Sequence, residues 1–239
     1  MFFSNNMSQF QNIKHCFFSK NKGFSKGIYK SLNCGLGSND KSEDIIKNLK
    51  LMNQTHSSKV VIIDKNNQNL NKFDSDALVT KLQNIAIGVL TADCVPVFLY
   101  DKKNKIIACL HAGWRGAKNG IIENTVNKIR SMEENNNIIA SIGPCIGKNS
   151  YEVDSDFYNN FLKESDYNKL YFSKKNNFKF LFNLRLYVES KLKKCDIVDI
   201  DNIDEDTYQD SDNFFSYRRS VTLKELDYGR CVSTICLKT

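Results

Sequence analysis

The sequence is poor in proline, histidine and tryptophan. Its 239 residues include two prolines, three histidines and one tryptophan. No Gly/Ser-rich linker, internal repeat or break in composition separates two halves, so we predict one domain that spans residues 1–239. Three histidines are also too few to ligate the several centres of a multicopper oxidase.

Long apolar stretches and long runs of one charge are missing as well. Phe2-Phe3 and Phe17-Phe18 are too short and too interrupted for a signal peptide, and no segment approaches the roughly 20 apolar residues of a membrane span. The net charge of +7 is spread along the chain, without interleaved aromatic and basic motifs. We therefore predict a cytoplasmic protein that tolerates anionic ligands and binds neither nucleic acid nor membranes.

Cysteine is abundant, with eight residues, but no two of them form a C-x-x-C pair. Thiols stay reduced in the cytosol, so we predict free cysteines that mostly pack as small apolar residues. Cys145 follows the Gly143-Pro144 turn, and we expect a loop that displays it near a site. Cys109 shares a strand face with His111, and core packing is the favoured interpretation for it.

Two apolar runs at the centre of the chain flank a short polar linker. Residues 91–101 and 106–116, joined by 102–105, predict a β-hairpin. A two-residue loop would place Cys94 opposite His111, and a three-residue loop would shift the register by one residue. Either register brings a thiol and an imidazole within reach of a shared proton or metal ion.

Charged residues surround this pair. Asp93 precedes Cys94 in an apolar segment, and the Gly113-Trp114-Arg115-Gly116 turn follows His111. A buried carboxylate or guanidinium is costly unless it is paired, so a functional site explains this cluster better than packing does. Arg115 also precedes a predicted helix, whose N-terminus would favour an anion.

Two further candidates have simpler interpretations beside them. His56 is predicted in a loop ahead of a strand, where a solvent-exposed histidine is the alternative to a ligand. Arg218 and Arg219 end an aromatic segment, and they either face a site or pair with the acidic loop at 201–212.

Hydrophobic periodicity predicts the remaining elements. Helices are expected over residues 41–52, 119–132, 154–164 and 183–194. Strands are expected over residues 60–64, 85–90, 195–200 and 230–237, with a further strand entered from the turn at 74–80.

Eight motifs follow one another along nearly the whole chain. They are Ser31-Leu32-Asn33, Gln54-x-His56, Asp76-Ala77-Leu78-Val79-Thr80, Thr91-Ala92-Asp93-Cys94-x-Pro96-Val97, His111-Ala112-Gly113-Trp114-Arg115-Gly116, Ile142-Gly143-Pro144-Cys145-Ile146-Gly147, Tyr151-Glu152-Val153 and Phe214-Phe215-Ser216-Tyr217-Arg218-Arg219. In this order they resemble the laccase-domain family, the YfiH-like proteins. The Ala-Asp-Cys and His-Ala-Gly-Trp-Arg-Gly motifs are the most specific.

The resemblance implies an α+β domain whose β-sheets are sandwiched between helices. It implies a zinc ion held by His56, Cys94 and His111, with copper as the alternative metal. The implied activity is phosphorolysis of adenosine, inosine and methylthioadenosine together with adenosine deamination. The chain departs from the family pattern at Asp206-Thr207, where members often carry Cys-Thr, and at Asn149 and Ser150, in a region where a second Cys is common.

Within this mechanism, each candidate residue has a predicted role. Three protein ligands leave a metal position open for water or substrate, so Cys94 and His111 are predicted to be catalytic as well as ligating. Asp93 is our hypothetical proton shuttle, and Arg115 is predicted to hold phosphate. The predicted substrate-binding residues are Arg218, Arg219 and Cys145.

Three other functions stay open at this point. Some family members have been called polyphenol oxidases, which would require a copper centre at this site. Others are linked to peptidoglycan editing, which a metal-free Cys94-His111 hydrolase would explain. A binding module without turnover is the third alternative.

Overall fold

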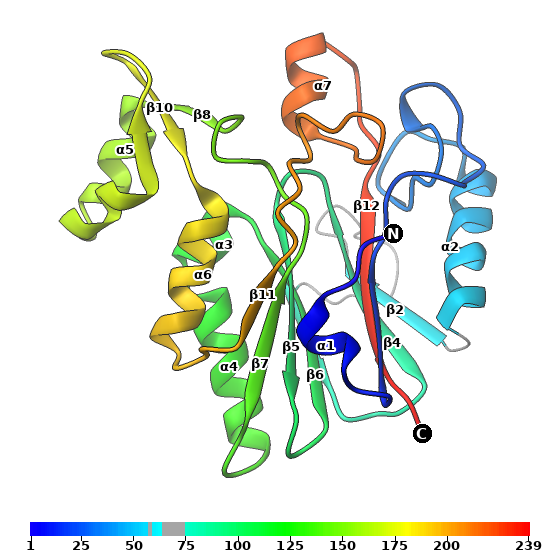
Figure 1. Ribbon diagram of the computed structural model, residues 1–239. Coiled ribbons are helices and arrows are strands. Elements are labelled where there is room, and N and C mark those ends of the chain that lie inside the picture. Colours follow the sequence, from blue (N-terminus) through cyan, green and yellow to red (C-terminus); the bar gives the residue numbers. More distant parts are fainter. Residues whose placement is uncertain (57–58, 64–74) are drawn as a thin grey trace.

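The computed structural model of the chain describes residues 1–56, 59–63 and 75–239, with side chains for residues 1–52 and 75–239 (Figure 1). Three sheets lie within these residues. The first has the strand order β11 (Ile200–Asn202), β7 (Ile138–Ile142), β5 (Val95–Asp101), β6 (Ile106–Ala112) and β3 (Ala77–Thr80). The second has the order β1 (Ile13–Phe17), β12 (Cys231–Leu237), β4 (Ile85–Thr91) and β2 (Lys59–Ile63), and the third has the order β8 (Glu152–Asp154), β10 (Lys179–Phe182) and β9 (Phe172–Lys174).

The two larger sheets pack face to face between two layers of helices. Helices α4 (Ile121–Met132) and α6 (Leu184–Lys194) cover the outer face of the five-stranded sheet, and α2 (Ser42–His56) covers the four-stranded sheet from the other side (Figure 1). The predicted α+β fold, with sheets sandwiched between helices, is therefore confirmed.

Strand β5 shows how the sequence specifies these layers. All its residues are buried, because successive side chains point to opposite faces and each face is covered. Val97 and Leu99 join the core beneath the helices, whereas Phe98 and Tyr100 join the core between the sheets. There the Phe98 ring stacks on Phe17 of β1, with 4.4 Å between ring centroids.

The hairpin of β5 and β6 is confirmed, but both predicted registers are wrong. Asp101 pairs with Ile106, and His111 pairs with Pro96. The connection has four residues because the Asp101 carboxylate accepts hydrogen bonds from the backbone of the turn and Lys105 adopts a left-handed conformation with φ of 54°. Cys94 consequently lies just before β5 and outside the ladder.

Three other predicted elements need correction. The helix predicted over 41–52 continues to His56, so His56 ends a helix and does not lie in a loop. Gly120, with φ of 87°, divides the predicted 119–132 segment, and the Gly113 to Gly116 turn is largely helix α3 (Trp114–Lys118). The strand predicted at 195–200 begins at Ile200, because the chain turns after α6 through the left-handed Asp196.

The remaining predicted helices and the closing strand β12 are confirmed, and five short elements complete the described chain. Side chains of Asp154 and Asn183 cap α5 (Ser155–Leu162) and α6. The short elements are α1 (Asn5–Ser8), η1 (Gly27–Tyr29), η2 (Asp166–Tyr171), β9 and α7 (Tyr217–Leu223). None of the described helices has the length and apolar character needed to cross a bilayer.

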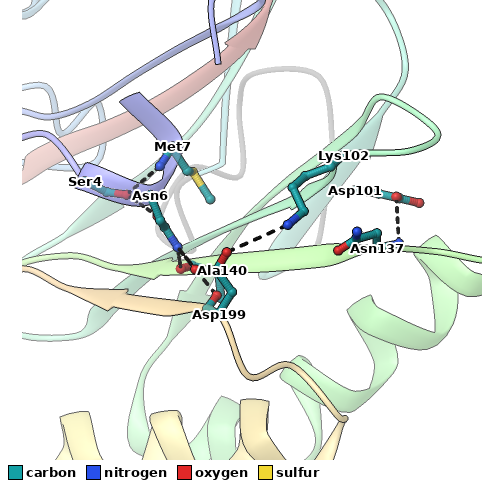
Figure 2. Close-up of polar contacts among 8 residues, drawn as sticks. All are labelled: Ser4, Asn6, Met7, Asp101, Lys102, Asn137, Ala140 and Asp199. Carbon is teal, nitrogen blue, oxygen red and sulfur yellow. Dashed lines mark hydrogen bonds and ion pairs between the residues drawn. The ribbon is translucent and has the colours of Figure 1, made fainter. Parts of the chain in front are cut away.

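Helix α1 fixes the N-terminal segment to the edge of the five-stranded sheet. Figure 2 shows Asn6 reaching Ala140 and Asp199, with its amide donating over 3.0 Å to the Ala140 carbonyl and 2.9 Å to the Asp199 carboxylate. Lys102 of the hairpin turn approaches the same carboxylate to 3.8 Å. The contacts join four chain segments that are distant in sequence.

Candidate active site

A cavity of about 200 Å³ lies where the turn before β5, the start of α3 and the start of α7 meet. The predicted residues Asp93, Cys94 and Arg218 all line it. Its other walls are largely apolar and aromatic, and they comprise Ala92, Trp114, Ile146, Tyr151, Leu184 and Tyr217. A mostly apolar cavity with a few converging polar groups is the usual form of a small-molecule site.

The structure brings Cys94 and His111 together. The Cys94 side chain lies close enough to the His111 imidazole to change its pKa. Burial disfavours the charged imidazole, but the neighbouring Cys94 sulfur and the Asp76 carboxylate outweigh it and raise the pKa of His111 to about 10.

Asp76 holds His111 from the opposite side, and the sequence did not single it out. Its Oδ1 lies 3.3 Å from His111 Nδ1, and its carbonyl accepts a 2.8 Å hydrogen bond from the His111 backbone. A carboxylate can only accept, so Nδ1 carries the proton in this contact and Nε2 is the free ligand atom. The Asp76-Ala77-Leu78 motif was the one signal that could have identified this residue.

Gly113 leaves the space that the Cys94 sulfur occupies. A Cβ atom added at Gly113 would lie 3.0 Å from Cys94 Sγ. The backbone there is extended, so the requirement for glycine is steric and does not arise from a left-handed conformation. Gly113 also stands at the N-cap of α3, directly before the Trp114 side chain that lines the cavity.

Asp93 is buried and fully engaged by the segment around α7. Its carboxylate accepts hydrogen bonds from the Thr207 hydroxyl at 2.7 Å, the Ser216 hydroxyl at 2.9 Å and the Arg218 backbone at 2.6 Å. Burial raises the pKa of Asp93, while these donors and Arg219 oppose the rise. The contacts favour an anchoring role, and the role of proton shuttle stays a prediction.

The two adjacent arginines of α7 have different surroundings. The Arg218 guanidinium lies 5.2 Å from the centroid of the Tyr151 ring and donates to the Glu152 carbonyl, at the wall of the cavity. Arg219 donates to the carbonyls of Thr207, Tyr208 and Phe214. The Arg219 side chain thus pairs with backbone carbonyls of the acidic loop, and the role of Arg219 in substrate binding stays a prediction.

Arg115 and Cys145 lie outside the described lining of the cavity. Arg115 is exposed, and its guanidinium stacks 4.7 Å from the centroid of the Trp114 ring, at the back of a cavity wall. Cys145 is fully buried, which raises the pKa of its thiol to about 11 and contradicts the prediction that a loop displays it. Their roles in binding phosphate and substrate stay predictions.

The other cysteines behave as the composition predicts. All eight are free, and every one except Cys94 is buried. Cys94 is therefore the cysteine that solvent and a ligand can reach, and it lies beside His111.

The donor set suits a zinc ion, so far as the described side chains extend. Cys94 supplies sulfur, and His111 supplies a nitrogen whose partner nitrogen is held by a carboxylate, the usual support of a metal-bound histidine. The side chain of the third predicted ligand, His56, lies outside the described residues. Among the side chains that are described, no group of three histidines, cysteines or carboxylates could hold a metal ion.

Comparison with known proteins relates the chain to one family. Residues 14–238 match the family described as "Multi-copper polyphenol oxidoreductase laccase". A purine nucleoside phosphorylase of Rickettsia conorii is 36% identical over 231 residues, which cover 96% of this chain and 93% of that protein. An adenosine deaminase from an unknown prokaryote is 38% identical over 126 residues, which cover 49% and 48% of the two chains.

Solved structures show the same fold. A Neisseria meningitidis protein superposes with a TM-score of 0.83 at 29% identity, covering 96% of both chains. A Bacillus licheniformis protein titled hypothetical protein YfiH gives a TM-score of 0.82 at 25% identity, covering 95% of this chain and 93% of the other.

Proposed function

Because this chain belongs to the multi-copper polyphenol oxidoreductase laccase family, as its motifs indicated, we propose that it is a zinc-dependent purine nucleoside phosphorylase. Its proposed substrates are adenosine, inosine and methylthioadenosine, and it also deaminates adenosine. The proposal is supported by the names of similar relatives and by one feature of the site. That feature is the contact of Cys94 with a histidine that Asp76 orients, at the rim of a cavity of about 200 Å³.

The metal would be held by Cys94 and His111, with His56 as the proposed third ligand. When zinc is bound with one coordination position open, it acts as a Lewis acid and lowers the pKa of the water bound there to about 7. Asp76 keeps the His111 ring in the orientation that directs Nε2 toward Cys94. Because metal ligands must be deprotonated, loading this site would release protons.

The aromatic walls suit a purine base. Trp114, Tyr151 and Tyr217 present flat apolar surfaces, and an offset stack on a base gains contact area with little loss of rotamer freedom. Arg218 lies at the same wall, where its positive charge is available to a ribose oxygen or to phosphate. The cavity therefore offers an apolar part for the base and a cationic part for the groups that react.

Phosphorolysis requires that phosphate attack the anomeric carbon while the bond to the base breaks. The products are the free purine and ribose 1-phosphate, and the base leaves with the electrons of the glycosidic bond. Arg115 is the proposed phosphate ligand, because its guanidinium is fixed against Trp114 and is not paired in an ion pair among the described residues. Two fixed cations near phosphate would stabilise the charge that develops.

Replacement of Arg115 tests the phosphate assignment. We expect Arg115→Ala to raise the KM for phosphate about tenfold or more, because a charge-assisted hydrogen bond is lost. Arg130→Ala is the matched control, since Arg130 lies in the last turn of α4 and donates to the Cys195 carbonyl, and the KM of this variant for phosphate should equal that of the wild type. An unchanged KM for phosphate in Arg115→Ala would show that this residue does not hold it.

A panel of nucleosides tests the reaction itself. We expect adenosine, inosine and methylthioadenosine to release their bases only when phosphate is present, as measured by chromatography. Conversion of adenosine to inosine without phosphate would report the deaminase activity. A protein that releases no base from any of the three would be a binding module or would act on other substrates.

A second function is favoured by the same contact. A cysteine hydrolase uses a nucleophile, a base and a carboxylate that orients the base. These roles would fall to Cys94, His111 and Asp76. Such an enzyme would cleave peptidoglycan precursors without a metal ion. A copper-dependent polyphenol oxidase is a third candidate, but His15 already accepts a hydrogen bond from the Ser4 backbone, which leaves few histidines for further copper centres.

A further inference from the structure

A second cavity, of about 230 Å³, shares α7 with the candidate active site. The helix contributes Tyr217 and Arg218 to the active site and Arg219 to this second cavity. The other wall is the loop that follows β1, which contributes Lys20 and Lys30 and lies beside α7 at the top of Figure 1. The phosphorylase proposal assigns no role to this cavity as a whole.

Positive charge predominates in it. Lys20, Lys30 and Arg219 line the cavity, and Glu225 is the single carboxylate of its described lining. Within the described part of the chain, neither lysine ammonium takes part in a hydrogen bond or an ion pair. Burial and the nearby Arg219 lower the pKa of Lys20 by more than Asp212 raises it, so the chain leaves this charge incompletely neutralised.

The walls are held in place before any ligand arrives. The Lys20 backbone donates to Asn213 at 2.7 Å and accepts from Ser31 and Leu32. The Lys20 ammonium lies 5.5 Å from the centroid of the Phe215 ring, which limits where it can go. Arg219 is fixed by its carbonyl partners, so Arg219 and Lys20 are preorganised at little further entropic cost.

We propose that this cavity binds a small phosphate monoester. Its phosphate would lie between Lys20 and Lys30, because ammonium groups are effective point charges for phosphate. Its organic part would contact Tyr228, which lines the same cavity and is partly exposed. A sugar phosphate has both parts, whereas a bare phosphate ion has no organic part to contact Tyr228.

Calorimetric titration of the full chain with ribose 5-phosphate tests the proposal, with ribose as the neutral counterpart. We expect ribose 5-phosphate to bind, ribose not to bind, and inorganic phosphate to bind more weakly. Lys20→Gln and Lys30→Gln should each raise the Kd about tenfold, since each loses a charge-assisted contact. Lys105→Gln is the matched control, because Lys105 also lies over an aromatic ring but outside this cavity.

Two further variants separate this site from the candidate active site and from misfolding. Glu225 is exposed, so Glu225→Gln should keep the fold and lower the Kd by removing a repelling charge. Arg115→Ala should leave the Kd unchanged. The proposal is overturned if no binding occurs, if ribose binds equally well, or if both lysine variants match the wild type. Loss of binding in Arg115→Ala alone would also overturn it, and would instead place the anion at the proposed phosphorylase site.

Discussion

At the scale of single residues, Gly113 controls how closely the chain passes the Cys94 sulfur. An alanine there would bring its Cβ to 3.0 Å from Sγ, so the sulfur would have to move by a few tenths of an ångström. We expect Gly113→Ala to lower kcat/KM for base release about tenfold or more, because small displacements of a reacting group are costly. Its free energy of unfolding should change little, since the extended backbone there accepts any residue.

Gly116→Ala provides the control in the same helix. An added Cβ would meet its nearest atoms at 3.7 Å, which is ordinary contact, and alanine favours helices. Activity of Gly116→Ala should therefore match the wild type. Equal losses in the two variants would show that the effect arises from the helix and not from the sulfur.

Two replacements of Asp93 distinguish an anchoring role of this residue from a role as proton shuttle. Asp93→Ala would leave the hydroxyls of Thr207 and Ser216 and the Arg218 backbone without their acceptor, and should lower the free energy of unfolding by about 2–5 kcal/mol. Asp93→Asn retains an acceptor oxygen and should recover most of the stability and most of kcat. Urea unfolding and adenosine deamination would be measured on both variants. A kcat for Asp93→Asn as low as that of Asp93→Ala would favour the shuttle instead, because an amide cannot transfer the proton.

The sequence predicted the site residues whose chemistry is unusual for their position. Cys94 and His111 stood out because two strands had to bring them together, and Asp93 stood out as a carboxylate in an apolar segment. Asp76 did not, because one acidic residue in a turn has many explanations. Arg219 and Cys145 were singled out by residue type alone. The residue type does not reveal that Arg219 already donates to backbone carbonyls or that Cys145 is buried.

At the scale of elements, the Asp101 carboxylate holds the hairpin turn against the next connection. It accepts from the Asn136 amide at 2.6 Å, the Asn137 backbone at 3.0 Å and the Asn104 amide at 2.8 Å. Burial alone would raise the pKa of Asp101, but these donors lower it below its ordinary value. A lowered folded-state pKa contributes stability that is present above the unfolded pKa of about 3.9 and is lost as pH falls through the folded value.

We therefore expect Asp101→Asn to cost about 1–3 kcal/mol at pH 7 and progressively less toward pH 3. Urea unfolding at a series of pH values would measure it. Asp204→Asn is the control, since the Asp204 side chain is 94% exposed and should change the stability little at any pH. A constant difference between Asp101→Asn and the wild type from pH 7 to pH 3 would contradict the account.

The two departures from the family pattern meet in one contact. Asp206 stands where members often carry cysteine, and its carboxylate accepts hydrogen bonds from the Gly147 backbone at 2.9 Å and the Ser150 hydroxyl at 2.6 Å. Ser150 lies in the region where a second cysteine is common. A hydrogen-bonded pair thus joins these two loops here, next to Thr207, which supports Asp93.

Elements with strong periodicity were predicted and those specified by tertiary contacts were not. The apolar faces of α4 and α6 and the apolar and β-branched residues of β12 are local signals. The short strands β8 and β9 and helix α1 have no such signal, because their bounds depend on contacts like that of Asn6 with Ala140. Likewise, the hairpin register depended on side-chain bonds of Asp101 that a loop length does not reveal.

At the scale of the whole molecule, two sheets lie between two helical layers (Figure 1), and this fold brings the turn before β5, the start of α3 and the start of α7 together around one cavity. The layers followed from the motif resemblance and not from periodicity, since strands buried on both faces lose their alternation. The convergence of the pair Cys94 and His111 with Asp76 is what gives the fold a reactive centre.

Metal removal and restoration test the central claim most directly. Base release from a purine nucleoside in the presence of phosphate would be followed before chelation, after chelation and after the addition of zinc or copper, with the metal content determined at each stage. We expect about one zinc ion per chain, loss of base release on chelation and recovery with zinc, and neither metal nor activity in Cys94→Ser. Full base release by the metal-free protein would contradict a zinc enzyme at this site.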